Sequence, residues 1–257
     1  MTQAASDGAA RLGAMSDDDA EPRKEIPESI FADDDGSADA HLAQALIRHS
    51  HGKTALADVV DALTYARVLV PVVASGHARF VGKHGVEQDE VASTGVVAVE
   101  MPDGRRALPI FTDVDAMRAW SPQARPIPAE GPRAALAAVS EGWSAMVLNP
   151  GMETVLVPRP AVWALGQGEP WRPAVVDGEV DADVQAAVVD AVTVDDALRA
   201  VEATPGRGAE VAVVLRLVPG LTQPEVDQVV QRVERELARS AVVAHRVDSV
   251  ELRLATA

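Results

Sequence analysis

The chain has 257 residues, a formal net charge of −16 and a pI near 4.7; apolar residues make up 47 % of it and aromatic residues only 3 %. This length suits one large or two small domains, with a core built mainly from Val, Leu and Ala. The sequence has no cysteine, which excludes disulfides, thiolate metal sites and cysteine nucleophiles. A charge of this sign is repelled by phosphate backbones, so we expect no direct nucleic-acid partner and a basic protein surface as the better electrostatic match.

Residues 1–38 are predicted to be a disordered acidic arm. Within residues 1–40, eleven acidic residues stand against three basic ones, a net charge of −8. Such a segment buries too little apolar surface to offset its chain entropy. We interpret the arm as a solubilising tail, with a regulatory arm that contacts a basic partner as the alternative.

Membrane insertion and secretion are not indicated. No apolar run approaches the ~20 residues that span a bilayer, and the first residues lack the apolar centre of a secretory signal. We therefore expect a cytoplasmic protein without membrane contact.

Residues 39–165 are predicted to form an N-terminal α/β domain that begins with a helical hairpin. Apolar side chains recur there at helical spacing, Gly52 separates the two helices, and Thr54 is expected to cap the second. The two stripes consist of Leu42, Ala45, Leu46 and His49, and of Leu56, Val59, Val60 and Leu63.

Strands and helices alternate after the hairpin. Apolar runs predict strands at residues 67–74, 94–101, 106–111, 125–129, 145–148 and 154–157. Pro71 lacks an N–H, which favours an edge or a bulge in the first strand, and a glycine- and histidine-rich loop follows at 75–89.

Two helices are expected between these strands. Thr112 and Asp115 have capping-box spacing at the start of the first helix, and Gly131-Pro132 opens the second, which Gly142 closes. The expected inward-facing residues are Val114, Met117 and Trp120 in the first helix, and Ala135, Leu136 and Val139 in the second.

The clearest turn signal is Asn149-Pro150-Gly151, where Pro fixes φ and Gly accepts a positive φ. Trp163 and Trp171 follow in a connector rich in Pro and Gly, residues 158–173. Aromatic side chains in such a connector either dock it onto a domain or offer a surface to a partner. We predict a partner-binding surface made of Asn149, Pro150, Gly151, Trp163 and Trp171.

A linker rich in Pro, Gly and acidic residues is predicted at 166–183, followed by a C-terminal α/β domain at 184–257. Its expected order is β-α-β-α-β, with strands at 184–194, 210–218 and 249–255. The first helix is expected to be capped by Thr193 and Asp196 and to run to Val201. The second is expected to have about 17 residues and to start at a Thr222–Glu225 capping box. The fold class is thus α/β (α+β), with a mixed sheet and flanking helices in the N-terminal domain.

One ordered series of short motifs resembles the N-terminal domain of the SseB family, which is named for an enhanced-serine-sensitivity phenotype. The motifs are Pro109-Ile110-Phe111-Thr112, Met117 to Trp120, Arg125-Pro126-Ile127-Pro128, and Met146 to Gly151. The resemblance covers roughly residues 40–165, and residues 185–255 are similar, less specifically, to the smaller C-terminal domain of the family. It implies an α/β fold in a family widespread in bacteria, and it transfers no catalytic residue.

Candidate chemical sites are few. His41, His49 and His51 lack the i, i+4 spacing of helical zinc sites, so we read them as helix-end histidines and keep a metal site as the alternative. His77 and His84 lie in the glycine loop, where a functional role stays open. Gly52-Lys53-Thr54 lacks the first glycine of a phosphate loop.

We therefore expect a non-catalytic interaction or regulatory protein with a protein partner and no cofactor, although the sequence leaves an enzyme open. One alternative is a small-molecule binder or enzyme with a pocket where the loops after Ala74, Met101 and Phe111 converge. Another is a structural subunit of a larger assembly.

Overall fold

The computed structural model describes residue 31 and residues 34–73, 80–81, 87–88 and 95–257. The chain divides into two compact units, residues 1–33 and 34–257, and every element below belongs to the second. In this described part the fold is a mixed α+β fold, as the sequence predicts. Most of the acidic arm, together with His77 and His84, lies outside the described residues.

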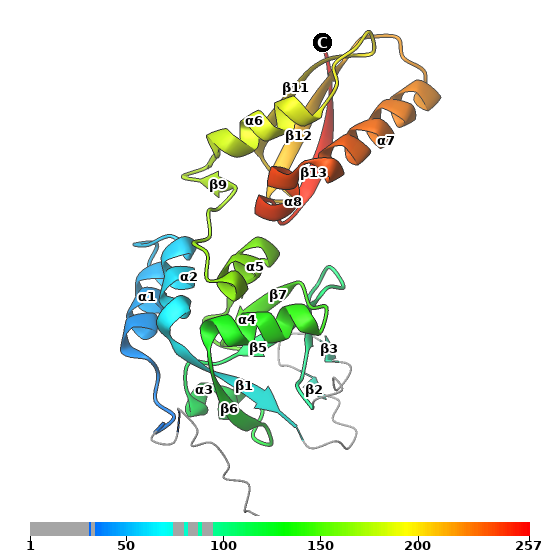
Figure 1. Cartoon of the computed structure of the whole chain (residues 1–257). Helices are drawn as coiled ribbons and strands as arrows, with labels where there is room; N and C mark the ends of the chain where they lie inside the picture. Colours follow the sequence, from blue (N-terminus) through cyan, green and yellow to red (C-terminus); the bar gives the residue numbers. More distant parts are fainter. Residues whose placement is uncertain (1–30, 32–33, 74–79, 82–86, 89–94) are drawn as a thin grey trace, which may run out of the picture. The chain divides into compact units, whose positions relative to one another are not determined.

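The helices and strands follow one another along residues 40–256 (Figure 1). The helices are α1 (Ala40–Ser50), α2 (Leu56–Tyr65), α3 (Val114–Trp120), α4 (Gly131–Ser140), α5 (Arg159–Gln167), α6 (Ala182–Ala191), α7 (Gln223–Arg239) and α8 (Ala241–Arg246). The strands are β1 (Arg67–Val72), β2 (Phe80–Val81), β3 (Glu87–Gln88), β4 (Val99–Glu100), β5 (Arg106–Ile110), β6 (Arg125–Glu130), β7 (Ala145–Leu148), β8 (Val155–Val157), β9 (Val175–Val176), β10 (Glu179–Val180), β11 (Leu198–Pro205), β12 (Val211–Leu217) and β13 (Val250–Thr256).

The sheet of the first lobe, residues 40–165, has the order β4-β5-β7-β8. β5 and β7 run parallel, whereas β4 and β8 pair antiparallel at the two sides. β1 pairs with β6 and is joined to the end of β5 because Leu69 and Phe111 exchange two backbone hydrogen bonds of 2.8 and 2.9 Å. The sheet is therefore mixed, and the parallel pair lies at its centre.

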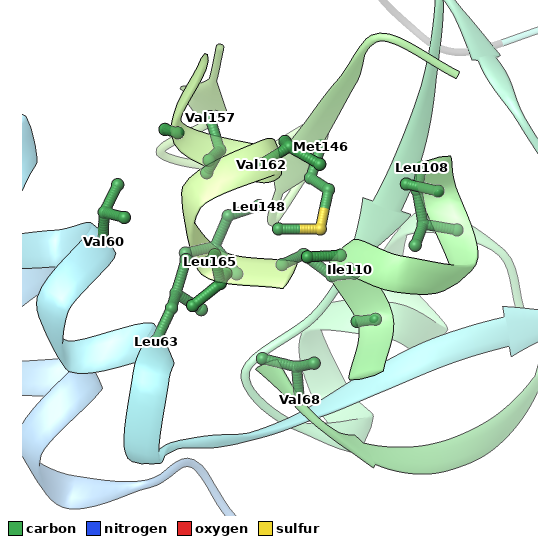
Figure 2. Packing of buried hydrophobic residues seen from close by; sticks show 14 of the residues in the cluster. Val60, Leu63, Val68, Leu108, Ile110, Met146, Leu148, Val157, Val162 and Leu165 are labelled. Atoms are coloured by element: carbon green, nitrogen blue, oxygen red, sulfur yellow. The ribbon is translucent and has the colours of Figure 1, made fainter. Parts of the chain in front are cut away.

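Helices α2, α4 and α5 bury the main core of the first lobe against β5 and β7. Figure 2 shows Val60 and Leu63 of α2 and Leu165 of α5 gathered around Leu148 and Ile110. At about 25 cal/mol per Å² of apolar surface, this cluster of aliphatic side chains supplies most of the driving force of the lobe.

One glycine lets α4 begin directly against the end of α2. A Cβ atom on Gly131 would lie 2.0 Å from the carbonyl oxygen of Leu63, so no other residue fits this position without moving the backbone. The face that α4 turns inward is made of Ala134, Ala135 and Ala138. Leu136, which we expected to be buried, is half-exposed because it lies on the outer side, against Gly166 of α5.

The second lobe has its own cluster of buried aliphatic residues, from Ala174 to Val247. Its sheet has the order β11-β12-β13, with β12 antiparallel to β11 and parallel to β13. Helices α6 and α7 lie on the same face of this sheet (Figure 1). The predicted long helix is confirmed at 17 residues, and Thr222 and Glu225 form the expected capping box.

Two elements of the second lobe differ from the expected β-α-β-α-β order. Residues 184–191 belong to helix α6 rather than to a strand. The reason is that the Asp181 carboxylate caps the N–H groups of Asp183 and Val184 and that Val184 and Val188 are buried at helical spacing. The helix predicted after Thr193 is instead strand β11.

The Asp195 carboxylate accounts for that second error. It accepts the N–H groups of Leu198 and Ala197 and so closes a turn that leads into β11, not a helix. These bonds, that of Leu198 above all, and the nearby Arg232 guanidinium hold the pKa of Asp195 below its usual value. The lobe therefore reads α-β-β-α-α-β from residue 182 onward.

The helix caps of the first lobe also lie one residue away from their predicted places. Asp113, not Thr112, caps α3, since its carboxylate accepts the Ala116 N–H at 2.8 Å. Ala55 is the N-cap of α2, and Thr54 beside it donates its hydroxyl to Asp58.

Candidate functional site

The carboxyl ends of the parallel strands β5 and β7 bring Thr112 and Asn149 together. The Thr112 N–H donates to Asn149 Oδ1 at 3.0 Å, and Asn149 Nδ2 donates to Thr112 Oγ1 at 3.1 Å. The Asn149 N–H in turn donates to the carbonyl oxygen of Ile110 at 2.9 Å. The predicted partner-binding turn is thus fixed to the next strand by three hydrogen bonds.

The turn has the backbone conformation that its sequence indicates. Asn149 and Gly151 have φ angles of +50° and +86°, and the Thr154 hydroxyl bridges the turn between the Asn149 carbonyl and the Gly151 N–H. Asn tolerates a positive φ better than most residues because its short amide side chain can bond locally. Beyond this hydrogen-bonded turn, the side chain of Met152 is 59 % exposed.

Residues 34–37 lie against the same end of the sheet. The Arg67 guanidinium donates to the Thr112 carbonyl and the Asp34 carboxylate, both at 2.9 Å, and to the Ser37 carbonyl. The side chains of Arg67 and Asp34 are only 14 % and 12 % exposed. Residues 34–37 of the predicted arm are therefore held against this end of the sheet by a largely buried cation 33 residues away in sequence. The boundary at residue 38 stays a prediction.

The polar groups of this strand-end cluster, Asp34, Arg67, Thr112, Asp113 and Asn149, are bonded to one another. The Thr112 hydroxyl donates to Asp113 Oδ2 at 2.8 Å while the other Asp113 oxygen caps α3. The Thr112 hydroxyl and both oxygens of Asp113 are thus engaged in hydrogen bonds within the cluster and at the start of α3. The cluster links residues at the ends of neighbouring strands and holds the turn that follows Asn149 at the protein surface.

The two predicted tryptophans occupy different environments. Trp163 lies on helix α5 and is 44 % exposed, so the connector we expected around it is helical from Arg159 to Gln167. Trp171 is partly buried against the main cluster of the first lobe. Its indole N–H is buried and makes no hydrogen bond within the described residues.

The histidines of the first hairpin take part in local backbone bonds. Nδ1 of His49 lies 3.1 Å from the Thr54 carbonyl oxygen, and Nδ1 of His51 lies 2.6 Å from that of Ile47, so each ring carries its proton on Nδ1. Within the part of the chain that the structure describes, no three His, Asp or Glu residues gather as metal ligands.

The loops that we expected to converge into a pocket do not all lie at one end of the sheet. β4 runs antiparallel to β5, so the turn after Met101 lies at the start of β5, at the opposite end from Thr112. The loop after Ala74 lies outside the described residues. Of the two described loops, the one after Phe111 reaches the strand-end cluster, where it meets Asn149.

A group of charged residues that the sequence did not single out surrounds Asp248. Arg105 Nη1 lies 3.0 and 3.1 Å from its two carboxylate oxygens, and the Arg159 N–H donates to one of them. The Asp248 N–H donates to Glu210 at 2.7 Å. Burial, with the negative charge of Asp248 as a lesser cause, raises the pKa of Glu210, although the Asp248 N–H acts against it.

The comparison with known families agrees with this fold and its motifs. Residues 42–164 match the model of the SseB protein N-terminal domain, an α+β segment that includes β5, β7 and the turn after Asn149. Residues 42–164 of the chain are therefore an SseB protein N-terminal domain. The match ends at residue 164, so the resemblance of the second lobe to the C-terminal domain of the family stays a prediction.

No curated protein and no solved structure matched the chain. Of the helices in the described ranges, none has the length and apolar character needed to cross a bilayer.

Proposed function

We propose that this SseB-family protein is a non-catalytic, cytoplasmic interaction protein that binds a protein partner through the segment from Asn149 to Trp163, with Trp171 supporting the helix behind it. The observation that carries the proposal is the exposure of large apolar side chains along one short stretch. Met152, Leu156 and Trp163 are 59 %, 41 % and 44 % exposed, and they lie just after the turn, on β8 and on α5. Exposed aromatic and Met side chains on a rigid support are typical of partner-binding surfaces.

The surroundings of this segment favour a partner rather than a substrate. A shallow hollow of about 320 Å³ lies between the segment Glu153–Leu156 and the end of α1 with the start of α2. Its apolar lining is Leu46, Leu56, Val155 and Leu156, and its polar lining is His49, Ser50, Glu153 and Thr154. It can accept an apolar side chain of a docked protein. The polar groups of the strand-end cluster are already paired with each other, which supports a binding role over a catalytic one.

The charge of the chain supports a partner with a basic contact surface. The net charge is −16, and half of it falls within residues 1–40. Opposite charges accelerate encounter and favour one class of partner over others, whereas the apolar contacts determine how long the complex lasts.

Site-specific photo-crosslinking in cells tests this proposal. A photoreactive amino acid placed at Met152 or at Trp163 is expected to capture one and the same protein. The matched control is Ile127 on β6, which is 50 % exposed and lies outside the segment. Capture of the same set of proteins from all three positions, or of none from Met152 and Trp163, contradicts the proposal.

A further inference from the structure

The last strand of the second lobe has one edge to which no other described strand pairs. β13 pairs with β12 on one side, and the sheet order β11-β12-β13 ends there. The Ala257 N–H donates to the Leu217 carbonyl, and the Val211 N–H donates to the Ser249 carbonyl. Odd-numbered residues thus direct their backbone groups toward β12, so Val250, Leu252 and Leu254 direct theirs toward the open edge.

The side chains of these even-numbered residues are apolar and incompletely covered. Val250, Leu252 and Leu254 stand opposite Val211, Val213 and Leu215 in the parallel register, on the face that α7 covers. Even so, Val250 is 39 % exposed and Leu254 is 52 % exposed. A hollow of about 390 Å³ between β13 and helices α7 and α8 runs beside Val250 and Leu252.

The odd-numbered residues in between carry opposite charges placed symmetrically. Glu251 precedes Leu252 and Arg253 follows it, so the sequence Val250-Glu251-Leu252-Arg253-Leu254 is self-complementary when reversed. An antiparallel copy centred on Leu252 places Glu251 opposite Arg253 of the second copy, at both ends of the pair. It also places Val250 opposite Leu254 of the second copy.

We propose that the open edge of β13 binds the β13 edge of a second copy of this chain, antiparallel and centred on Leu252, to form a continuous six-stranded sheet across a two-fold axis. Such an isologous contact uses the same surface on both subunits. The charge pattern of β13 favours a second copy in this register. A copy shifted by two residues in one direction places Glu251 opposite Glu251, and a copy shifted in the other direction places Arg253 opposite Arg253. Like charges directly opposite each other destabilise a strand pair.

The backbone geometry agrees with this register. Val250, Leu252 and Leu254 present their N–H and C=O groups outward, so they form the hydrogen-bonded pairs of the new ladder. Glu251 and Arg253 then form the non-hydrogen-bonded pairs, whose Cα atoms approach to about 4.5 Å and whose side chains interact most closely. One register therefore satisfies both the outward direction of the backbone groups and the pairing of opposite charges.

Within one chain, Glu251 already accepts the N–H groups of Arg207 and Gly208 and a bond from Arg253. The side chains of Glu251 and Arg253 are 27 % and 33 % exposed. In the dimer each carboxylate gains a second guanidinium, so the four charges alternate across the two-fold axis. Pairing also removes the open edge, which is otherwise a site of uncontrolled association.

Charge reversal in the full-length chain tests the proposal by sedimentation velocity. The wild-type chain is expected to dimerise in the micromolar range. Arg253→Glu and Glu251→Arg are each expected to weaken dimerisation by about 30-fold or more, because both charged pairs become repulsive. An equimolar mixture of the two variants is expected to recover a heterodimer, since every facing pair is then opposite in charge.

The matched control is Arg216→Glu on β12, a charge reversal on the same face but one strand away from the edge. It is expected to leave dimerisation unchanged. Because Glu251 also holds the turn at Arg207, circular dichroism melting of each variant verifies that it folds. Two results overturn the proposal. One is a wild-type chain that stays monomeric at about 100 µM, and the other is a dimer that forms equally well with either single charge reversal.

Discussion

The two lobes treat the edges of their sheets in different ways. In the four-stranded sheet of the first lobe the outer strands β4 and β8 have two and three residues, so they offer a second chain almost no backbone to pair with. The six-residue β6, at the edge of the β1-β6 pair, contains Pro126 and Pro128, which have no N–H to donate. In the second lobe the outer strand β13 has seven residues, alternates apolar with charged side chains, and is open on one side. Short edge strands prevent association, whereas a long edge with a self-complementary pattern permits one specific association.

The lobes also differ in how they fill their cores. The first lobe sets a helix of small residues, with Gly131 and three buried alanines, close against the end of α2. The second lobe uses a single layer of Val and Leu from the sheet and from α6 and α7. The two sets of buried residues form separate clusters, so we expect each lobe to have a stability of its own.

The strongest test of this comparison removes one buried leucine from each core. Leu148→Ala and Leu215→Ala each leave a cavity at a residue that is 0 % exposed, so each is expected to lower the free energy of unfolding of its lobe by about 3 kcal/mol. Differential scanning calorimetry is expected to show each substitution lowering a different transition. A single transition that both substitutions shift equally would show that the lobes unfold as one unit.

A smaller effect is expected at the strand-end cluster. Arg67→Met leaves the largely buried Asp34 carboxylate without its cation. We expect the free energy of unfolding to fall by about 2–3 kcal/mol, near the lower limit for a broken buried ion pair. Arg133→Met is the control, since its pair with Glu130 is exposed and worth less than about 1 kcal/mol. Urea denaturation of both variants measures the difference, and equal losses would show that residues 34–37 add nothing to the first lobe.

The smallest expected effect is the pH dependence that Glu210 imposes. Its pKa is raised in the folded chain, chiefly by burial, so the folded state keeps this proton to a higher pH than the unfolded state does. The stabilising contribution of protonated Glu210 is present below its usual pKa of 4.5 and is lost as the pH rises through the raised value. Glu210→Gln is expected to remove this loss.

Melting temperatures of the wild-type chain and of Glu210→Gln, measured between pH 4 and pH 8 in steps of about half a unit, compare the two slopes. Asp181 and Asp195 have lowered pKa values, through Arg246 and through the Leu198 N–H respectively, and they act in the opposite direction in both proteins. Identical slopes for the two proteins would contradict the assignment to Glu210.

Sequence alone could predict the elements whose signals are local and unambiguous. The capping box at Thr222, the apolar stripe of α7 and the turn at Asn149 each lie within a few residues, and the structure has all three. Helix α5 was missed although Pro160 in its first turn and Gly168 at its end, with a φ of +70°, are ordinary helix boundaries. We interpreted Pro160 and Gly168 only as helix-breaking residues, and the prediction therefore missed helix α5.

The other errors come from interactions that are distant in sequence or from ambiguous carboxylates. Asp181 and Asp195 are both followed by apolar residues, yet one caps a helix and the other closes a turn into a strand. Residues 34–37 have a disorder-like composition, and groups distant in sequence hold them: Arg67 donates to Asp34 and Ser37, and the Val114 N–H donates to the Gly36 carbonyl. No spacing rule connects Asp34 with Arg67, or Arg105 with Asp248, because the fold alone brings them together.

The position of β13 in the chain has a consequence for biosynthesis. This strand follows every other described strand, and it pairs in parallel with β12, which precedes it by the whole of α7. During translation the first lobe is completed while the self-complementary edge has yet to be synthesised. Nascent chains on neighbouring ribosomes therefore cannot join through that edge before their own N-terminal lobes have been synthesised.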